Sequence, residues 1–282
     1  MPSFLDGIFM VNRVMKSIKI MSFNILTSSL PSKKHHWNDR KQLVLDIIRR
    51  HAPDVVGFQE VQQDQLGTLV DALGDYGCYH QEWHSDVLKQ ELLPIFYLKD
   101  RLAVVQSGTF WINKTPDLPR IEDGEVLRAC TWVHLAQADE PSQNAIAVYH
   151  SHFDNKKQWL RELGAGLVLD RLSSQSQGIP AIFIGDLNTT PESSAYRRLR
   201  TRFRDAFLDA PAIRMPDQIT CHAFTGATSM VRFRPTIQWI DYILMDATLK
   251  CTNATRILDH PKELAGIYPS DHWPILAEFT LC

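Results

Sequence analysis

The stretch Pro53-Asp54-Val55-Val56-Gly57-Phe58-Gln59-Glu60-Val61 is an apolar run of strand length that ends on an amide and a carboxylate. Carboxylate and amide side chains that end separate strands can meet at one edge of a sheet, where their oxygens suit Mg²⁺ or Mn²⁺. Such a pattern indicates a metal-dependent site for phosphoester chemistry. Four further segments repeat the design: Met21-Ser22-Phe23-Asn24, Gly185-Asp186-Leu187-Asn188, Ile240-Asp241-Tyr242 and Tyr268-Pro269-Ser270-Asp271-His272-Trp273-Pro274.

The remaining apolar pattern predicts strands that alternate with helices. Apolar runs bounded by turn residues predict strands at residues 18–23, 55–58, 145–149 and 181–184. Residues 39–51 and 156–174 place leucine and isoleucine at helical spacing, and residues 94–110 resemble a hairpin. This order of elements predicts mixed sheets covered by helices.

The length and the absence of linkers favour one domain. The chain has 282 residues, of which 44% are hydrophobic, so it can bury a sizeable core. Residues 1–16 are predicted to be an N-terminal extension rather than a signal peptide, because Asp6 interrupts their only apolar stretch. Residues 17–282 are predicted to form a single domain, since the acidic segments run from Asn24 to His272 without a linker.

Charge and cysteine content narrow the possible partners and compartment. The formal net charge of −2 argues against a broadly basic surface that binds a polyanion over its whole extent, but it is compatible with a local basic rim around the site. The five widely spaced cysteines include no C-x-x-C pair, which favours reduced thiols in a cytoplasmic protein, with one or two disulfides as the alternative. No run approaches the roughly 18 apolar residues of a membrane span, so no stable membrane insertion is expected.

Six motifs stand in the same order as in a known family. They are Ser22-Phe23-Asn24, the stretch from Pro53 to Val61, Ser151-His152-Phe153-Asp154, Gly185-Asp186-Leu187-Asn188-Thr189-Thr190-Pro191, Ile240-Asp241-Tyr242-Ile243 and Ser270-Asp271-His272-Trp273-Pro274. Over roughly residues 18–279 the chain thereby resembles the endonuclease/exonuclease/phosphatase superfamily, which includes deoxyribonuclease I. The resemblance implies a deoxyribonuclease I-like α/β (α+β) fold of four layers, in which a two-sheet β-sandwich is flanked by helices.

The same resemblance implies the roles of the site residues. Asn24, Glu60 and Asp271 match the groups that hold Mg²⁺ or Mn²⁺ directly or through water, and no other cofactor is implied. Asp186 matches the carboxylate that orients or deprotonates the attacking water, and Asn188 a donor to the phosphate. His152 and His272 match histidines on the phosphate, Asp241 and Glu91 the carboxylates that orient His272 and His152, and Arg128 an arginine that contacts the phosphate.

Simpler interpretations exist for several of these residues. Asp186 and Asn188 could form an Asx-turn or cap the following helix, Glu91 could be a surface charge, and Arg128 could form a surface salt bridge. The chain also departs from many relatives, because Trp239 stands where they carry an arginine two residues before the aspartate; Arg232 and Arg234 could supply that charge. The inositol-phosphate phosphatase pattern P-A-W-C-D-R is absent, which disfavours a soluble inositol phosphate.

These features favour a metal-dependent hydrolase of phosphoester bonds, a nuclease or related phosphodiesterase that uses a Mg-assisted in-line attack by water. The substrate is expected to be a phosphodiester, with nucleic acid favoured over lipid because no amphipathic basic helix for docking on a bilayer is visible. One alternative is a phosphatase or a sphingomyelinase-like lipid phosphodiesterase. A second is a non-catalytic member that binds phosphorylated ligands. Endo or exo action and oligomeric state stay open.

Overall fold

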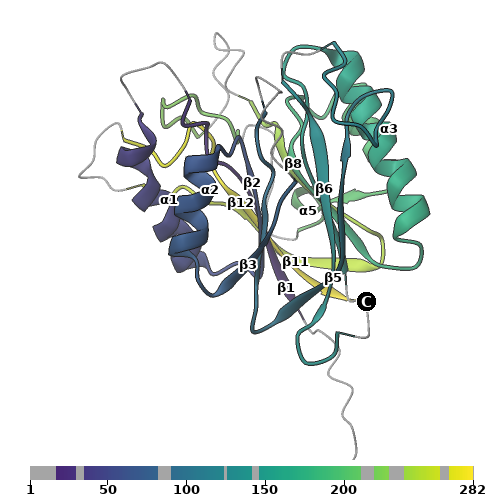
Figure 1. The fold of residues 1–282 in the computed structure, drawn as a ribbon, viewed down its shortest axis with the longest axis horizontal. Helices are drawn as coiled ribbons and strands as arrows, with labels where there is room; N and C mark the ends of the chain where they lie inside the picture. Colours follow the sequence, from purple (N-terminus) through teal and green to yellow (C-terminus); the bar gives the residue numbers. More distant parts are fainter. Residues whose placement is uncertain are drawn as a thin grey trace, which may run out of the picture.

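Two six-stranded mixed sheets lie face to face between helices (Figure 1). The structure is a computed structural model that describes residues 17–29, 35–81, 90–123, 126–141, 146–210, 219–228, 238–260 and 267–281. The predicted extension at residues 1–16 and the residues Arg232 and Arg234 lie outside these ranges. The two-sheet sandwich flanked by helices, predicted above, is confirmed.

The first sheet contains both chain-terminal strands of the described fold. Its spatial order is β11 (Leu249–Arg256), β12 (Ile275–Leu281), β1 (Ile18–Asn24), β2 (Val55–Gln59), β4 (Ile95–Leu98) and β3 (Tyr76–Tyr79). The second sheet runs in the order β5 (Leu102–Trp111), β6 (Ala129–Gln137), β7 (Ile146–His152), β8 (Ala181–Asp186), β10 (Asp241–Met245) and β9 (Arg204–Asp205). Strands β1 and β2 are parallel, as are β7 and β8.

Helices cover the outer faces of both sheets, which completes four layers. Helices α1 (Trp37–His51) and α2 (Gln63–Ala72) lie on the first sheet, and α3 (Gln158–Gln175) lies on the second (Figure 1). The short helices α4 (Ser194–Leu199) and α5 (Ala206–Asp209) follow β8. None of the helices in the described ranges is long and apolar enough to cross a membrane.

Strand β1 shows how the sequence divides its side chains between two layers. Ile18 and Ile20 pack into the core between the sheets, whereas Met21 and Phe23 pack against the helices on the outer face. Side chains of a strand alternate between faces, so a strand that is covered on both sides reads as a nearly continuous apolar run. This is why the apolar runs predicted strands at residues 18–23 and 55–58.

Gly57 lets the two sheets approach closely beneath the site. A Cβ atom at this position would lie 2.7 Å from Ile184 Cδ1 and 2.9 Å from the ring of His150, both in the second sheet. These separations are shorter than van der Waals contact, so a larger residue would push the sheets apart. The glycine in the middle of the β2 run therefore has a packing role between the sheets.

The predicted hairpin at residues 94–110 is wrong. Strands β4 and β5 do occupy this stretch, but β4 pairs with β2 and β3 in the first sheet, while β5 pairs with β6 in the second. The short turn after Leu98 therefore carries the chain from one sheet to the other. Local turn residues and apolar spacing predict a reversal of direction, but they do not specify which strand becomes the partner.

Arg40 in α1 ties together loops that are far apart in the sequence. Its side chain is fully buried, with 0% exposed, and among the described residues its hydrogen bonds go to backbone carbonyls. Nε donates to His35 (2.8 Å), Nη1 to Ile25 and Pro269 (both 2.7 Å), and Nη2 to Leu26 (3.1 Å). Burial lowers the pKa of Arg40 to about 10, which still leaves the guanidinium charged at neutral pH.

We expect Arg40→Met to lower the free energy of unfolding by about 3 kcal/mol, because several buried carbonyls would lose their donor. Urea unfolding at neutral pH measures the change. Arg49→Met on the same helix is the matched control, since Arg49 is exposed, and it should change stability by less than about 0.5 kcal/mol. Equal stability losses in the two variants would contradict a special role for Arg40.

Candidate active site

Asp186 lies at the centre of the candidate site, at the end of β8. In the sheet register it stands beside His152 of β7 and opposite Asp241 of β10. The preceding Gly185 has a φ of 145°, and a Cβ there would lie 1.8 Å from the carbonyl oxygen of Ser151. Glycine is therefore required where the strand brings Asp186 to the sheet edge.

One carboxylate oxygen of Asp186 faces three side chains from other elements. Oδ2 lies 3.1 Å from Asn24 Nδ2, 3.5 Å from His152 Nε2 and 3.8 Å from His272 Nε2. The side chain is almost completely buried, and burial together with the charge of Asp241 raises its pKa. The raised pKa makes this carboxylate a stronger base than an exposed aspartate.

The other oxygen of Asp186 holds the loop that follows. Oδ1 accepts a hydrogen bond from the backbone N–H of Asn188 at 2.8 Å, which is the Asx-turn anticipated from the sequence. Helix α4 is instead capped by Ser193, whose hydroxyl accepts from Tyr196 N. The turn and the site geometry therefore coexist, because each uses a different oxygen of Asp186.

His272 forms a close pair with Asp241. Nδ1 of the imidazole lies 2.8 Å from Asp241 Oδ2, and both side chains are buried. Burial alone would lower the pKa of His272, but Asp241 and Cys221 outweigh it and raise the pKa well above its ordinary value. The pair with Asp241 thus favours the protonated imidazole, whose Nε2 is directed toward Asp186.

His152 is held from both ring nitrogens. Nδ1 lies 3.2 Å from Glu91 Oε2, and Nε2 lies 2.8 Å from the side-chain amide nitrogen of Asn188. Asn188 adopts a left-handed backbone with a φ of 48° and also donates to the carbonyl of Phe153 at 3.1 Å. The loop after β8 thereby places its amide against the histidine of β7.

Arg128 pairs with Glu91 in a largely buried position. Its Nη1 lies 2.8 Å from the same Glu91 oxygen that faces His152, and only 6% of Arg128 is exposed. Burial would raise the pKa of Glu91, but Arg128 and His152 outweigh it and hold the pKa at about 2. Glu91 is therefore a buried, ionised partner of His152, and the predicted phosphate contact of Arg128 stays a prediction.

Glu60 follows β2 in a left-handed backbone conformation with a φ of 63°. Its two carboxylate oxygens accept from Asn24 Nδ2 (3.0 Å) and from the N–H of Thr27 (3.1 Å). Burial raises the pKa of Glu60, and the charges of Glu91 and Asp271 raise it further. The three predicted metal residues Asn24, Glu60 and Asp271 are thus brought to the same edge.

A divalent cation would fit beside Glu60, because burial and the charge of Asp271 disfavour its ionised carboxylate and a bound cation would compensate that charge. A second group, Asp186, Asp241 and His272, has ligand atoms that all lie within 4.8 Å of one another. In that group His272 Nδ1 already donates to Asp241, so the short distances are explained by an ion pair. The carboxylate of Glu60, by contrast, accepts from Asn24 and Thr27 and forms no ion pair with a cationic side chain among the described residues.

Several contributors to the site were not predicted from the sequence. The charge of buried Arg40 is stabilised by the nearby carboxylates of Asp271 and Glu60. Gln59 Nε2 contacts His150 Nε2 (2.6 Å) and donates to Ser22 (3.0 Å) under the sheet edge. Buried polar residues inside otherwise apolar strands were the available signal, since such groups are buried only where they find partners.

Trp239, which replaces an arginine of many relatives, is 7% exposed and packs edge-on against Phe207 with ring centroids 4.9 Å apart. It belongs to the core rather than to the rim of the site. The four cysteines in the described ranges are free thiols, as predicted: Cys78, Cys130, Cys221 and Cys251.

Comparison with known proteins identifies the family of the chain. The family model described as Endonuclease/Exonuclease/phosphatase family matches residues 21–272. The chain is 27% identical over 298 residues to Nocturnin from Xenopus laevis, covering 94% of this chain and 73% of that protein. It spans 65% of the length of human Nocturnin, to which it is 25% identical.

Solved structures share the fold. A mannosyl-6-phosphatase of Bacteroides thetaiotaomicron superposes with a TM-score of 0.81 at 22% identity, covering 94% of this chain and 100% of that chain. D. rerio TDP2 complexed with a single-strand DNA product superposes with a TM-score of 0.71 at 17% identity, covering 94% and 99%. At these identities the likeness establishes the fold and leaves the substrate open.

Glu91→Gln should lower the free energy of unfolding at pH 7 by about 2 kcal/mol, because the folded state depresses the pKa of Glu91 from 4.5 to about 2. A depressed carboxyl pKa contributes stability above pH 4.5, and this contribution is lost as the pH falls toward 2. Urea unfolding between pH 3 and pH 7 should show the difference between wild type and variant shrinking toward low pH. A difference that does not depend on pH would remove the ion pair as its cause.

Proposed function

Because the chain belongs to the endonuclease/exonuclease/phosphatase family, we propose that it is a divalent-metal-dependent hydrolase of phosphodiester bonds that acts on a nucleic-acid strand. The observation that carries the proposal is the carboxylate of Asp186, which lies within 4 Å of Asn24, His152 and His272. In this arrangement the carboxylate can accept a proton from a water molecule while the two histidines beside it bind a phosphate. The residue roles below belong to this proposal.

Asp186 orients the attacking water and accepts its proton. The raised pKa of Asp186 supports this role, since a general base works best when its pKa approaches the working pH. Asn24 donates to Oδ2 and Asn188 donates to Oδ1, so the carboxylate is fixed before substrate binds. Such preorganisation lowers the cost of reaching the transition state.

His272 and His152 bind the phosphate from two sides of Asp186. The ion pair with Asp241 keeps His272 protonated, and Nε2 is then a charged donor to a non-bridging oxygen. Glu91 lies beside Nδ1 of His152, and Nε2 contacts the amide of Asn188; a phosphate oxygen that replaces this contact would accept from both groups. Together these groups can stabilise the charge that develops on phosphate oxygens while the P–O bond to the leaving group breaks.

Glu60 and Asp271, with Asn24 beside them, would hold the divalent cation. A bound Mg²⁺ or Mn²⁺ supplies Lewis-acid stabilisation of charge on the phosphate oxygens. Asn24 donates to both Glu60 and Asp186, so it connects the side of the cation to the side of the base. Removal of metal by a chelator should therefore abolish turnover without removing the hydrogen-bonded framework.

Nucleic acid is the substrate class that we favour, because a relative of the same fold, TDP2, has been captured with a single-strand DNA product. A phosphomonoester is the competing substrate class, since a mannosyl-6-phosphatase also shares the fold, with the higher TM-score of the two. A substrate panel tests the choice: single-stranded DNA, RNA, abasic duplex, sphingomyelin, nucleotide and sugar monoesters, each assayed with Mg²⁺, Mn²⁺ and chelator. Hydrolysis confined to monoesters or lipid would overturn the nucleic-acid substrate.

We expect Glu60→Gln to lower turnover by about 100-fold or more and to shift the Mg²⁺ requirement to higher concentration. Thermal unfolding gives a second measurement that does not depend on activity. Mg²⁺ should raise the melting temperature of the wild type and have a smaller effect on the variant. In chelator the variant should be at least as stable, because a raised carboxyl pKa means that ionised Glu60 costs stability as the pH rises above it.

The control for this prediction is Glu278→Gln, which removes a half-exposed carboxylate that pairs with Lys19. It should leave both the turnover and the Mg²⁺ response unchanged. An unaltered metal titration in Glu60→Gln would remove Glu60 from the cation site.

Asp241→Asn should slow the wild-type enzyme strongly but slow the His272→Ala enzyme only slightly. Asp241 acts through the imidazole that it contacts, so little remains for it to do once the ring is absent. Single-turnover rates of the two single variants and the double variant complete the cycle. Multiplicative losses in the double variant would refute the coupling.

A further inference from the structure

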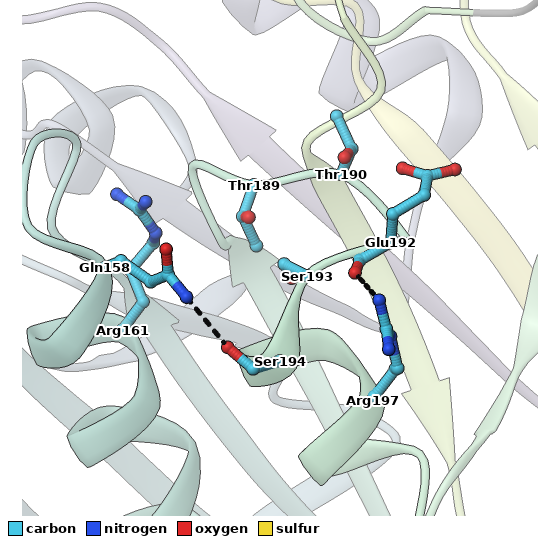
Figure 2. Close-up of a pocket in the computed structure, with 8 residues that line it drawn as sticks. All are labelled: Gln158, Arg161, Thr189, Thr190, Glu192, Ser193, Ser194 and Arg197. Atoms are coloured by element: carbon cyan, nitrogen blue, oxygen red, sulfur yellow. Dashed lines mark hydrogen bonds between the residues drawn. The ribbon is translucent and has the colours of Figure 1, made fainter.

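A cavity of about 400 Å³ opens beside the loop that follows β8, between the N-terminal end of α3 and the start of α4. Figure 2 shows Arg161 and Gln158 on the α3 side, Ser194 and Arg197 on the α4 side, and Thr189 between them. The roles proposed above use none of these side chains. We call this cavity the arginine pocket.

The arginine pocket adjoins the site through two consecutive carbonyl groups. The carbonyl of Phe153 accepts from Asn188 Nδ2 at 3.1 Å, and the next carbonyl, of Asp154, accepts from Arg161 Nη1 at 2.9 Å. Thr189, which lines the pocket, directly follows Asn188. The guanidinium of Arg161 is therefore anchored one residue away from the amide that contacts His152.

Both guanidinium groups keep donors for an anion. Arg161 is held by the carbonyl of Asp154 and Arg197 by the carbonyl of Glu192, and within the described residues neither forms a salt bridge with a carboxylate. A guanidinium has five N–H donors, arranged so that two can bind one phosphate. Each arginine therefore has unused donors next to the cavity.

Nearby carboxylates only partly offset this charge. Glu192 lines the pocket, but its carboxylate points away from Arg161 in Figure 2. Glu162 accepts a hydrogen bond from Gln158 at 2.8 Å and another from Ser194. Gln158 and Ser194 are thereby engaged with Glu162, and Glu162 and Asp154 both attract the charge of Arg161 without forming a salt bridge with it.

The segment 196–204 adds to the positive charge, since five of its nine residues are arginines. Arg202 and Arg204 in this segment are taken up by ion pairs with Asp246 and Asp209. Arg197 and Arg198 form no such pair among the described residues. The charges of the segment that have no ion pair among the described residues thus lie at Arg197 and Arg198 in α4 and at Arg200 directly after it, and Arg197 lines the pocket.

We propose that the arginine pocket binds a second phosphate of the substrate, one nucleotide step from the phosphate that is cleaved. The proposal rests on the proposed function and names a part of the nucleic-acid strand that the site holds. Arg161 and Arg197 supply the charge, and the hydroxyl of Thr189 supplies a neutral donor. A phosphate held here orients the strand along the edge of the second sheet, whereas a phosphomonoester with a single phosphate leaves the pocket unused.

The same chemistry could come from a small molecule that carries two phosphates, so the test separates a strand from such a molecule. The double variant Arg161→Gln/Arg197→Gln removes both charges. The matched control Arg49→Gln/Lys250→Gln removes two exposed charges near the end of α1 and the start of β11, at the opposite end of the sheets. Circular dichroism and melting temperature show that both variants fold.

Binding is measured in chelator by fluorescence anisotropy with a short single-stranded oligonucleotide, so that catalysis does not interfere. Loss of one phosphate contact should reduce the slope of log affinity against log salt by about 0.7 in the Arg161→Gln/Arg197→Gln variant and leave it unchanged in the control. An unchanged slope in the arginine variant overturns the proposal. A nucleoside 3′,5′-bisphosphate is measured in parallel. If its affinity depends on both arginines while the affinity of the oligonucleotide does not, the assignment to a strand is overturned.

Kinetics separate failure of this proposal from failure of the proposed function. A dinucleoside monophosphate has only the cleaved phosphate, and derivatives with an added 5′- or 3′-phosphate have a neighbour on one side. The wild type should show a Michaelis constant about tenfold lower for one of the derivatives, and the arginine variant should lose this difference while it cleaves the unmodified substrate normally.

Equal Michaelis constants for all three substrates in the wild type would overturn the pocket and leave the hydrolase intact. If the wild type cleaves none of them, nor any oligonucleotide, the proposed function falls and the pocket assignment falls with it.

Discussion

The burial of the Asp186 carboxylate is the constraint on which the arrangement of the site depends. A carboxylate with 1% of its surface exposed must find charged or hydrogen-bonding partners, or it takes up a proton. Its partners come from β1, β7, the loop after β8 and the segment before β12. These elements meet only where the two sheets are packed at one end, so the sandwich and the site form together.

The site contains two carboxyl groups with opposite electrostatic environments. Arg128 and His152 compensate the charge of Glu91 and hold its pKa at about 2, whereas burial and neighbouring carboxylates raise the pKa of Glu60. Groups whose environments drive their pKa values apart are typical of sites with divided roles. In the proposed mechanism Glu91 accordingly holds an imidazole in place, and Glu60 binds the cation.

The fold alone does not select the substrate. Proteins that act on a sugar phosphate and on DNA share this sandwich, as the mannosyl-6-phosphatase and the TDP2 complex show. Function in such a scaffold is set by the side chains around the common centre. In this chain two features near the centre bear on that choice: the arginine pocket lies beside Asn188, and Trp239, just before β10, is buried in the core.

Strands, helices and the ends of the strands were predictable, because apolar periodicity and turn residues act over a few neighbouring positions. The side chains of Val55, Val56 and Phe58 divide between two cores, and Glu60 comes two residues after Phe58. The carboxylate at the end of this strand can therefore be recognised in the sequence. The family motifs also singled out Asp186, Asn188 and His272, which the fold brings together, and their roles stay predictions. The domain boundary at residue 16 and the cytoplasmic location stay predictions.

Contacts between distant positions required the folded chain. Asn24 reaches Asp186 across 162 residues, and the partners of Arg40 are carbonyls, which every residue carries, so no pattern of side chains points to them. Two further features also required the folded chain: the change of sheet between β4 and β5, and the burial of Arg128 against Glu91. Such contacts depend on how the two sheets pack, and the free energy of that packing is a sum over the whole core rather than a property of any one segment.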